Sequence, residues 1–272
     1  MNLKLMKMLM TINENKLRNF LIYFLNRQGY TKIIKKQNFI LAEGDIPICL
    51  IAHLDTVNES IYNKTPEMCL YDEKQDIFHV VSGGTLDDRL GVFSIIQILL
   101  KGYRPSIIFT SGEEVGGIGA YELIEHYSKS PFDINFIIEL DRQGFNDAVY
   151  YNCDNKQFEQ YINSFGFITQ IGTFTDCLVI GEKWDIASVN LSCGYMKEHT
   201  IYEYAHLEWT LATILKVEKI LDDWVGVNNL PFTKLKYNTK KRRKNSCLEK
   251  QKIYQVEDSI DSLLLNELGT IQ

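Results

Sequence analysis

Apolar and polar positions along the chain follow two periods, one typical of helices and one typical of strands. A T-x-x-E capping box at Thr11 and Glu14 precedes apolar residues at helical spacing, and Gly29 ends this first predicted helix. Helical and strand patterns then alternate. The predicted strands are 38–41, 46–52, 77–81, 106–110, 132–140 and 188–192, and the further predicted helices are 90–100, 120–127, 157–165 and 203–224.

This alternation predicts an α/β fold around one sheet. The segments 46–52, 106–110 and 134–140 are continuously apolar, which is expected when helices cover both faces of a parallel sheet. We therefore expect three layers, α/β/α, with a mixed central sheet that is mostly parallel. Residues 1–230 are predicted to form the main domain, 231–252 a basic linker, and 253–272 an amphipathic C-terminal helix.

The composition is that of an ordinary globular protein, because 45% of the 272 residues are hydrophobic and 24% are charged. Disorder, collagen and coiled coil are therefore excluded for most of the chain. No apolar run approaches the ~18 residues of a membrane span, and Lys4 and Lys7 interrupt the apolar start of the chain. We expect a cytoplasmic protein without membrane contact. The six cysteines include no C-x-x-C pair, which favours reduced, buried thiols.

The net charge of −6 combines an acidic body with a basic tail. Residues 233–252 contain nine basic residues and one acid, Glu249, and carry a net charge of +8. The KKRRK run at 240–244 could bind nucleic acid or anionic lipid, but such runs are more often solvated linkers, which is the interpretation we favour. The terminal helix could dock a partner or pack on the body, and the sequence leaves both open.

Acidic residues and histidines follow the ends of the predicted buried strands. These residues are His53, Asp55, Asp87, Asp88, Glu113, Glu114, Glu139, Asp141 and His199. Because ligands bind beyond the carboxyl ends of strands in open α/β sheets, we expect these side chains to meet in one cleft. Carboxylates crowded in a low-dielectric cleft raise one another's pKa steeply unless a cation neutralises them. Two histidines and three or more carboxylates fit a pair of zinc ions better than a single ion.

Five motifs occur at these positions in a fixed order: AHLDTV (52–57), LDDRLG (86–91), SGEEVGGIGA (111–120), ELDR (139–142) and GYMKEHTIYEY (194–204). With these motifs the sequence resembles the co-catalytic zinc exopeptidases, a superfamily of leucyl-type aminopeptidases, tripeptidases and deblocking aminopeptidases. The resemblance spans about residues 40–210. It implies the zinc-exopeptidase (phosphorylase/hydrolase-like) architecture and a hydrolase of peptide bonds, most similar to an aminopeptidase.

The resemblance also implies a role for each motif residue. It makes Asp87 the ligand that bridges two Zn²⁺ ions, Glu113 the general base, and Asp55 the carboxylate that orients a ligating histidine. The implied metal ligands are His53, Asp87, Glu114, Asp141 and His199. The physics of a two-metal site agrees, because ions ~3.5–4 Å apart require a spanning ligand and acidify bound water. Co²⁺ or Mn²⁺ could replace zinc.

Other interpretations of single residues remain beside these roles. Asp88 could cap the helix that follows it. Glu139 competes with Asp141, and we prefer Asp141 because it lies further past the strand. Thr175 and Asp176 resemble a Thr/Ser-Asp turn of the superfamily, and we assign them no role from the sequence. The histidines expected to be structural or at the surface are His79, His126 and His206.

The spacing of the motifs predicts a compact member of the superfamily. Only 31 residues separate Asp55 from Asp87, and 57 separate Asp141 from His199. Both gaps must also supply core elements, so neither has room for an independent lid or dimerisation domain. One alternative is an N-acyl amino-acid deacylase that uses the same site. Another is a non-catalytic binding or assembly module acting through the basic tail, although the intact Glu113 argues against it.

Overall fold

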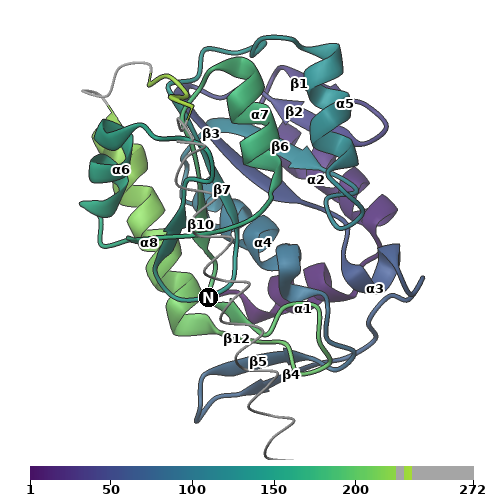
Figure 1. Cartoon of the computed structure of the whole chain (residues 1–272). Helices are drawn as coiled ribbons and strands as arrows, with labels where there is room; N and C mark the ends of the chain where they lie inside the picture. Colours follow the sequence, from purple (N-terminus) through teal and green to yellow (C-terminus); the bar gives the residue numbers. More distant parts are fainter. Residues whose placement is uncertain (225–229, 235–272) are drawn as a thin grey trace, which may run out of the picture. The chain divides into compact units, whose positions relative to one another are not determined.

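The computed structural model describes residues 1–224 and 230–234, in which an eight-stranded sheet lies between layers of helices (Figure 1). Across the sheet the strands follow the order β1-β2-β6-β3-β7-β10-β8-β9. Their bounds are β1 (Ile33–Lys35), β2 (Phe39–Ala42), β3 (Ile46–His53), β6 (Pro105–Thr110), β7 (Phe136–Arg142), β8 (Asp147–Val149), β9 (Ile168–Gln170) and β10 (Ser188–Ser192). The predicted α/β class with a mixed central sheet is confirmed.

The central strands β6, β3, β7 and β10 are parallel to one another. Leu50 in β3 lies opposite Ile107 in β6 and Ile138 in β7, so the carboxyl ends of these strands reach the same edge of the sheet. The pairs β1–β2, β2–β6 and β10–β8 are antiparallel. The parallel centre therefore positions the strand-end residues, whereas the antiparallel strands extend the sheet on both sides.

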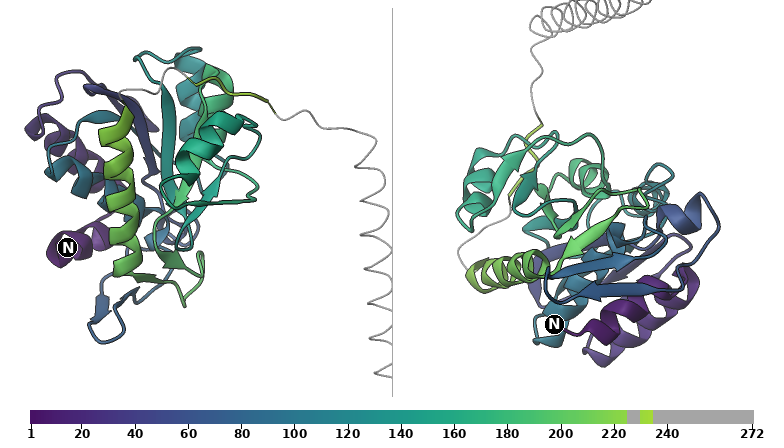
Figure 2. Two further views of the ribbon diagram at one scale, coloured as in Figure 1. Left: turned by 90° about the vertical axis from the view of Figure 1, so that its left-hand side faces the viewer. Right: turned by 90° about the horizontal axis from the view of Figure 1, so that it is seen from below.

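Helices cover both faces of the sheet (Figure 2). The helices packed into the larger core are α1 (Leu3–Thr11), α2 (Glu14–Arg27), α4 (Leu86–Leu100), α6 (Lys156–Asn163) and α8 (Leu207–Asp223). The other face is covered by α5 (Ile118–His126) and α7 (Asp176–Trp184). Within β3, Leu50 packs into the first core and Ile51 into the second, which explains the continuous apolar run of this strand.

The N-terminal region differs from the predicted capping box. Asn13 caps α2, because its Oδ1 accepts a hydrogen bond from Lys16 N at 2.9 Å. Thr11 instead ends α1, where its hydroxyl donates to Lys7 O. The prediction that Thr11 caps the helix was wrong because the preceding residues are themselves helical. Gly29, with a φ of +89°, follows the end of α2 as predicted.

A second, four-stranded sheet of order β11-β12-β5-β4 was not predicted as a unit. Its strands are β4 (Cys69–Asp72), β5 (Ile77–Val80), β11 (Tyr195–Met196) and β12 (Tyr204–His206), and the short helix α3 (Val57–Ser60) precedes it. The predicted helix 203–224 therefore begins too early, since residues 204–206 pair with β5 and α8 starts at Leu207. The short gap after Asp55 thus supplies β4 and β5 rather than a separate domain.

Residues 230–234 return to the main body. Leu230 and Phe232 are buried, and Leu230 exchanges backbone hydrogen bonds with Asn135 and Ala187. The basic run 240–244 and the expected helix 253–272 lie outside the described residues. In residues 1–224 and 230–234 no helix is long and apolar enough to cross a membrane. The five cysteines in the described part are free thiols.

Arg89 joins α4 to the N-terminal region through a fully buried guanidinium. It donates to the carbonyl oxygens of Leu9 (3.2 Å) and Ile12 (3.0 Å) and to Glu59 Oε2 (2.6 Å). The variant Arg89→Met leaves the mostly buried Glu59 carboxylate without its cation, so we expect the free energy of unfolding to fall by about 3 kcal/mol in urea denaturation.

The matched control for this prediction is Arg104→Met. Arg104 pairs with Asp45 at the surface, where both side chains are largely exposed. Exposed ion pairs contribute little, so this variant is expected to lose about 1 kcal/mol or less. Equal losses in the two variants would contradict the prediction.

Candidate metal centre

The predicted site residues come together at the edge where the parallel strands end. His53 is the last residue of β3, and Asp141 lies near the end of β7. Asp87 lies at the irregular start of α4, and Glu114 in the loop after β6. His199 lies between β11 and β12. The loops and strand ends thus supply side chains that are up to 146 positions apart in the chain, from His53 to His199.

The two oxygens of the Asp87 carboxylate face two different histidines. Oδ1 lies 3.1 Å from His53 Nε2, and Oδ2 lies 3.1 Å from His199 Nε2. His53 Nε2 is also 3.5 Å from Asp141 Oδ1, and His199 Nε2 is 3.0 Å from Glu114 Oε2. Asp87 is therefore placed between two groups, each with one imidazole and one further carboxylate, as a bridging ligand requires.

These contacts change the proton affinity of both histidines. The hydrogen bonds that His199 donates to the carboxylates of Asp87 and Glu114 raise the pKa of His199 to about 11. Burial lowers the pKa of His53, but its contacts with Asp141, Asp55 and Asp87 raise this pKa well above the usual range. The pKa of each histidine is raised for the same reason, because the carboxylates around the two imidazoles favour positive charge at the centre.

Asp55 connects the end of β3 to the loop that carries the two adjacent glutamates. Its carboxylate accepts backbone hydrogen bonds from Gly112, Glu113 and Glu114 at 2.8–3.2 Å. His53 Nδ1 lies 3.4 Å from Asp55 Oδ1 and 3.0 Å from the Asp55 carbonyl oxygen. The side chain therefore orients the imidazole and the glutamate loop together, with the contacts expected of a carboxylate behind a ligating histidine.

Glu113 and Glu114 diverge from this loop. The Glu114 side chain is 4% exposed, and its Oε1 is buried without a hydrogen-bond partner among the described residues. Glu113 borders a cavity of about 180 Å³ together with Asp87, Asp141 and His199. Burial, with the charge of Asp176 as a further cause, raises the pKa of Glu113 to about 8. One glutamate thus belongs to the group around His199, and the other faces the cavity.

The residues present suit a divalent cation. Three carboxylates and two imidazoles converge here, and Glu114 Oε1 has no hydrogen-bond partner among the described residues. Arg142 borders the same cavity, but its Nε lies 3.6 Å from the carboxylate of Asp147. Two sets of possible donor atoms lie within 4.8 Å of one another, namely His53 with Asp88 and Asp141, and His53 with Asp87 and Glu114. Imidazole and carboxylate are the ligands of catalytic zinc sites, so the fit is chemical as well as electrostatic.

Asp88 has the capping role that the sequence left open. Its Oδ1 accepts a hydrogen bond from Gly91 N (3.0 Å) in α4, and its Oδ2 accepts one from His53 N (3.1 Å). Both oxygens thus have backbone donors, and the side chain is fully buried. Asp88 therefore fixes the start of α4 against the end of β3.

Asp141 is held in place by contacts with Thr175 and Asn190, and Thr175 is in turn bonded to Glu139. Thr175 Oγ1 lies 2.6 Å from Glu139 Oε2 and 3.1 Å from Asp141 Oδ2. Asn190 accepts from Asp141 N and donates to Asp141 O. Glu139 is fully buried and does not border the cavity, whereas Asp141 does. Asn190 could have been found from the sequence, because it is a polar residue inside the predicted buried strand 188–192.

Glu203 is a buried residue that the sequence analysis did not single out. Its Oε2 accepts hydrogen bonds from Thr85 N (2.7 Å) and Leu86 N (2.8 Å), directly before Asp87. Burial raises the pKa of Glu203 to about 8. The residue was missed because the predicted helix 203–224 placed it on an ordinary helical turn.

Comparisons with known proteins agree with this architecture. No protein-family model matches the chain. A probable zinc metalloprotease of Pyrenophora tritici-repentis is 27% identical over 160 residues, which cover 57% of this chain and 36% of that protein. The chain thus matches little more than a third of this curated relative.

Two solved structures are similar over nearly their whole length. The aminopeptidase PepT of Bacillus cereus gives a TM-score of 0.64 at 13% identity, covering 81% of this chain and 97% of that one. A tripeptidase of Staphylococcus aureus gives a TM-score of 0.65 at 15% identity, covering 80% of this chain and 96% of that one. The chain therefore has the zinc-exopeptidase fold that its motifs predicted.

The contacts of Glu203 lead to a stability prediction. Glu203→Ala leaves two buried N–H groups without an acceptor, so we expect the free energy of unfolding to fall by about 3 kcal/mol. Glu203→Gln keeps an acceptor oxygen at the same place and is expected to lose about 1 kcal/mol or less. Urea denaturation of both variants measures the difference, and an equal loss would show that the two hydrogen bonds contribute little.

Proposed function

We propose that the protein is a zinc-dependent peptidase of the aminopeptidase type that holds two metal ions. The observation that carries this proposal is the placement of Asp87, whose two oxygens face His53 and His199 separately. Glu114 and His199 would hold one ion, and His53 and Asp141 would hold the other. The similarity to an aminopeptidase and a tripeptidase in fold supports the choice of peptide substrates.

Zinc held by these residues would supply Lewis acidity, which would polarise the scissile carbonyl and acidify water. Glu113 borders the cavity and lies outside the two groups around the histidines. Its carboxylate accepts the proton of the attacking water and then delivers that proton to the nitrogen of the leaving amine. Asp55 keeps the glutamate loop in place while this happens, because it accepts three of the loop's backbone hydrogen bonds.

Glu198 supports an aminopeptidase over the alternative N-acyl amino-acid deacylase. It borders the same cavity, and its Oε2 is buried without a hydrogen-bond partner in the described part of the chain. A buried carboxylate oxygen without a partner is costly unless a ligand satisfies it. The protonated amine at the start of an unblocked peptide is a cation that fits this position, whereas the uncharged amide of an N-acylated amino acid is not.

The metal content gives a direct test. We expect purified protein to contain two zinc ions per chain by elemental analysis, and a chelator to abolish release of free amino acids from unblocked peptides. His53→Ala and His199→Ala should each lower the zinc content, since each removes an imidazole from one group. The control His126→Ala changes an exposed histidine on α5 and should keep both ions. Preferred cleavage of acylated amino acids would instead favour the deacylase.

The role of Glu113 can be separated from metal binding. Glu113→Gln removes the base but no proposed ligand, so zinc content should remain at two per chain while kcat falls by about 10²–10⁴-fold. Glu125→Gln makes the same change at an exposed position on α5 and should leave both quantities unchanged. Unchanged turnover in the Glu113 variant would exclude Glu113 as the base.

A further inference from the structure

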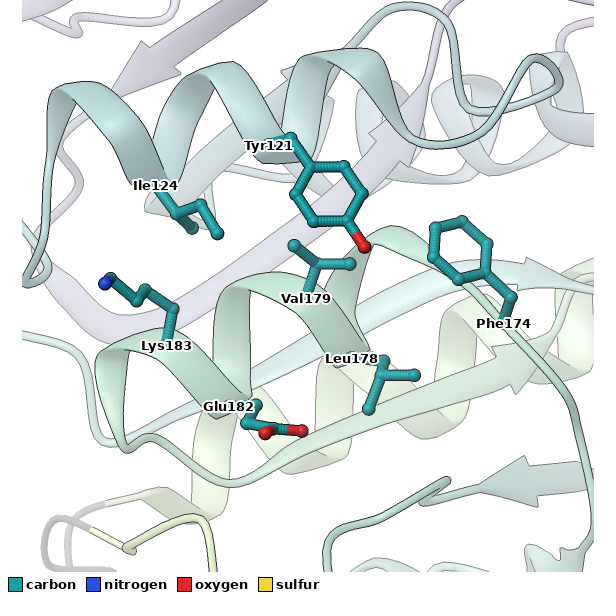
Figure 3. Close-up of a pocket in the computed structure, with 7 residues that line it drawn as sticks. All are labelled: Tyr121, Ile124, Phe174, Leu178, Val179, Glu182 and Lys183. Carbon is teal, nitrogen blue, oxygen red and sulfur yellow. The ribbon is translucent and has the colours of Figure 1, made fainter.

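An apolar groove lies between α5 and α7 on the face of the main sheet opposite the larger core (Figure 3). Its volume is about 420 Å³. The apolar residues that line it are Tyr121, Ile124, Phe174, Leu178 and Val179. Figure 3 shows Phe174 at one end of the groove and Lys183 at the other. None of these residues takes part in the proposed chemistry.

The groove begins where the catalytic cavity ends. Phe174 borders both spaces, and its ring packs on the loop that carries Glu113, because a Cβ on Gly117 would lie 2.7 Å from Phe174 Cζ. The side chains of Phe174 and Tyr121 remain 38% and 48% exposed. Exposed aromatic residues next to a cavity are typical of binding surfaces rather than of ordinary protein surface.

The size of the groove suits an extended peptide. α7 advances 1.5 Å per residue, so the stretch from Asp176 to Lys183 is about 10 Å long. An extended chain advances about 3.3 Å per residue, so roughly three residues fit along this length. A substrate that extends from the cavity past Phe174, which borders both spaces, therefore finds room for roughly three further residues in the groove.

The far end of the groove carries a cation. Glu182 is paired with Lys234, whereas Lys183 is exposed and has no carboxylate within 4.0 Å among the described residues. An ammonium group at the end of an apolar groove attracts a carboxylate that follows apolar residues. That carboxylate can belong to an acidic side chain or to the C-terminus of a peptide.

We propose that this groove binds the part of a peptide substrate that follows the scissile bond. It selects peptides with apolar residues in this part and a carboxylate that reaches Lys183. This inference rests on the proposed peptidase activity and adds to it a substrate class, namely peptides of about five or six residues rather than dipeptides.

The test compares a dipeptide with a hexapeptide that shares its first two residues and continues with apolar ones. The wild-type kcat/KM should be at least about tenfold higher for the apolar hexapeptide than for one with Ser and Gly at the same positions. Val179→Asp and Tyr121→Ser alter the two walls of the groove and should each remove most of this preference. Dipeptide cleavage should remain unchanged in both, which also shows that the variants fold.

Two further comparisons complete the design. Leu215→Asp introduces the same charge at a 43% exposed position on α8 and should keep the preference. Lys183→Gln should lower kcat/KM for the hexapeptide with a free C-terminus but not for its C-terminal amide. A hexapeptide amide with one Asp side chain tests the other source of the carboxylate. If Lys183 recognises an Asp side chain instead, Lys183→Gln should lower kcat/KM for this amide as well.

Each result has a distinct meaning. Failure to cleave any peptide overturns the proposed function and this inference together. Cleavage of dipeptides and hexapeptides with the same kcat/KM, whatever their later residues, overturns only the inference. The inference is also overturned if Val179→Asp abolishes a dimer in gel filtration and leaves the peptide preference intact, because the groove is then covered by a second copy of the chain.

Discussion

The mutual repulsion of buried carboxylates is the constraint on which this structure depends. Asp87, Glu114 and Asp141 converge with two imidazoles at one edge of the sheet, and each histidine contacts two of these acids. Such a cluster is unfavourable without compensating positive charge, since like charges at low dielectric oppose one another's ionisation. The proposed metal ions would supply this positive charge and offset the repulsion between the acids.

The backbone around the centre is fixed mainly by buried polar contacts. Asp88 joins the start of α4 to the end of β3, and Asp55 joins that strand end to the glutamate loop. Glu203 holds the residues before Asp87, and Asn190 holds Asp141. Positions of metal-binding groups must be accurate to a fraction of an ångström, and supporting hydrogen bonds of this kind supply that accuracy.

The candidate metal centre and the proposed peptide groove lie next to each other, because Phe174 borders both. α5 begins after Gly117 and α7 after Thr175, and Phe174, which precedes α7, borders both the cavity and the groove between these helices. The second sheet, which contains β5 and β12, positions the loop of His199 so that this histidine contacts the Asp87 oxygen that does not face His53. The site is thus built from the eight-stranded main sheet and the four-stranded second sheet.

The sequence determined the layers, the parallel centre and the identity of the strand-end acids and histidines, because continuous apolar strands and helical periods are local patterns. Asp141 rather than Glu139 borders the cavity, as preferred from the sequence, although both residues lie inside β7, which extends to Arg142. The cap at Asn13, the strand at 204–206 and the supports Glu203 and Asn190 could not be predicted. Their roles arise from contacts between distant segments, and only the packing of those segments decides which buried polar group meets which partner.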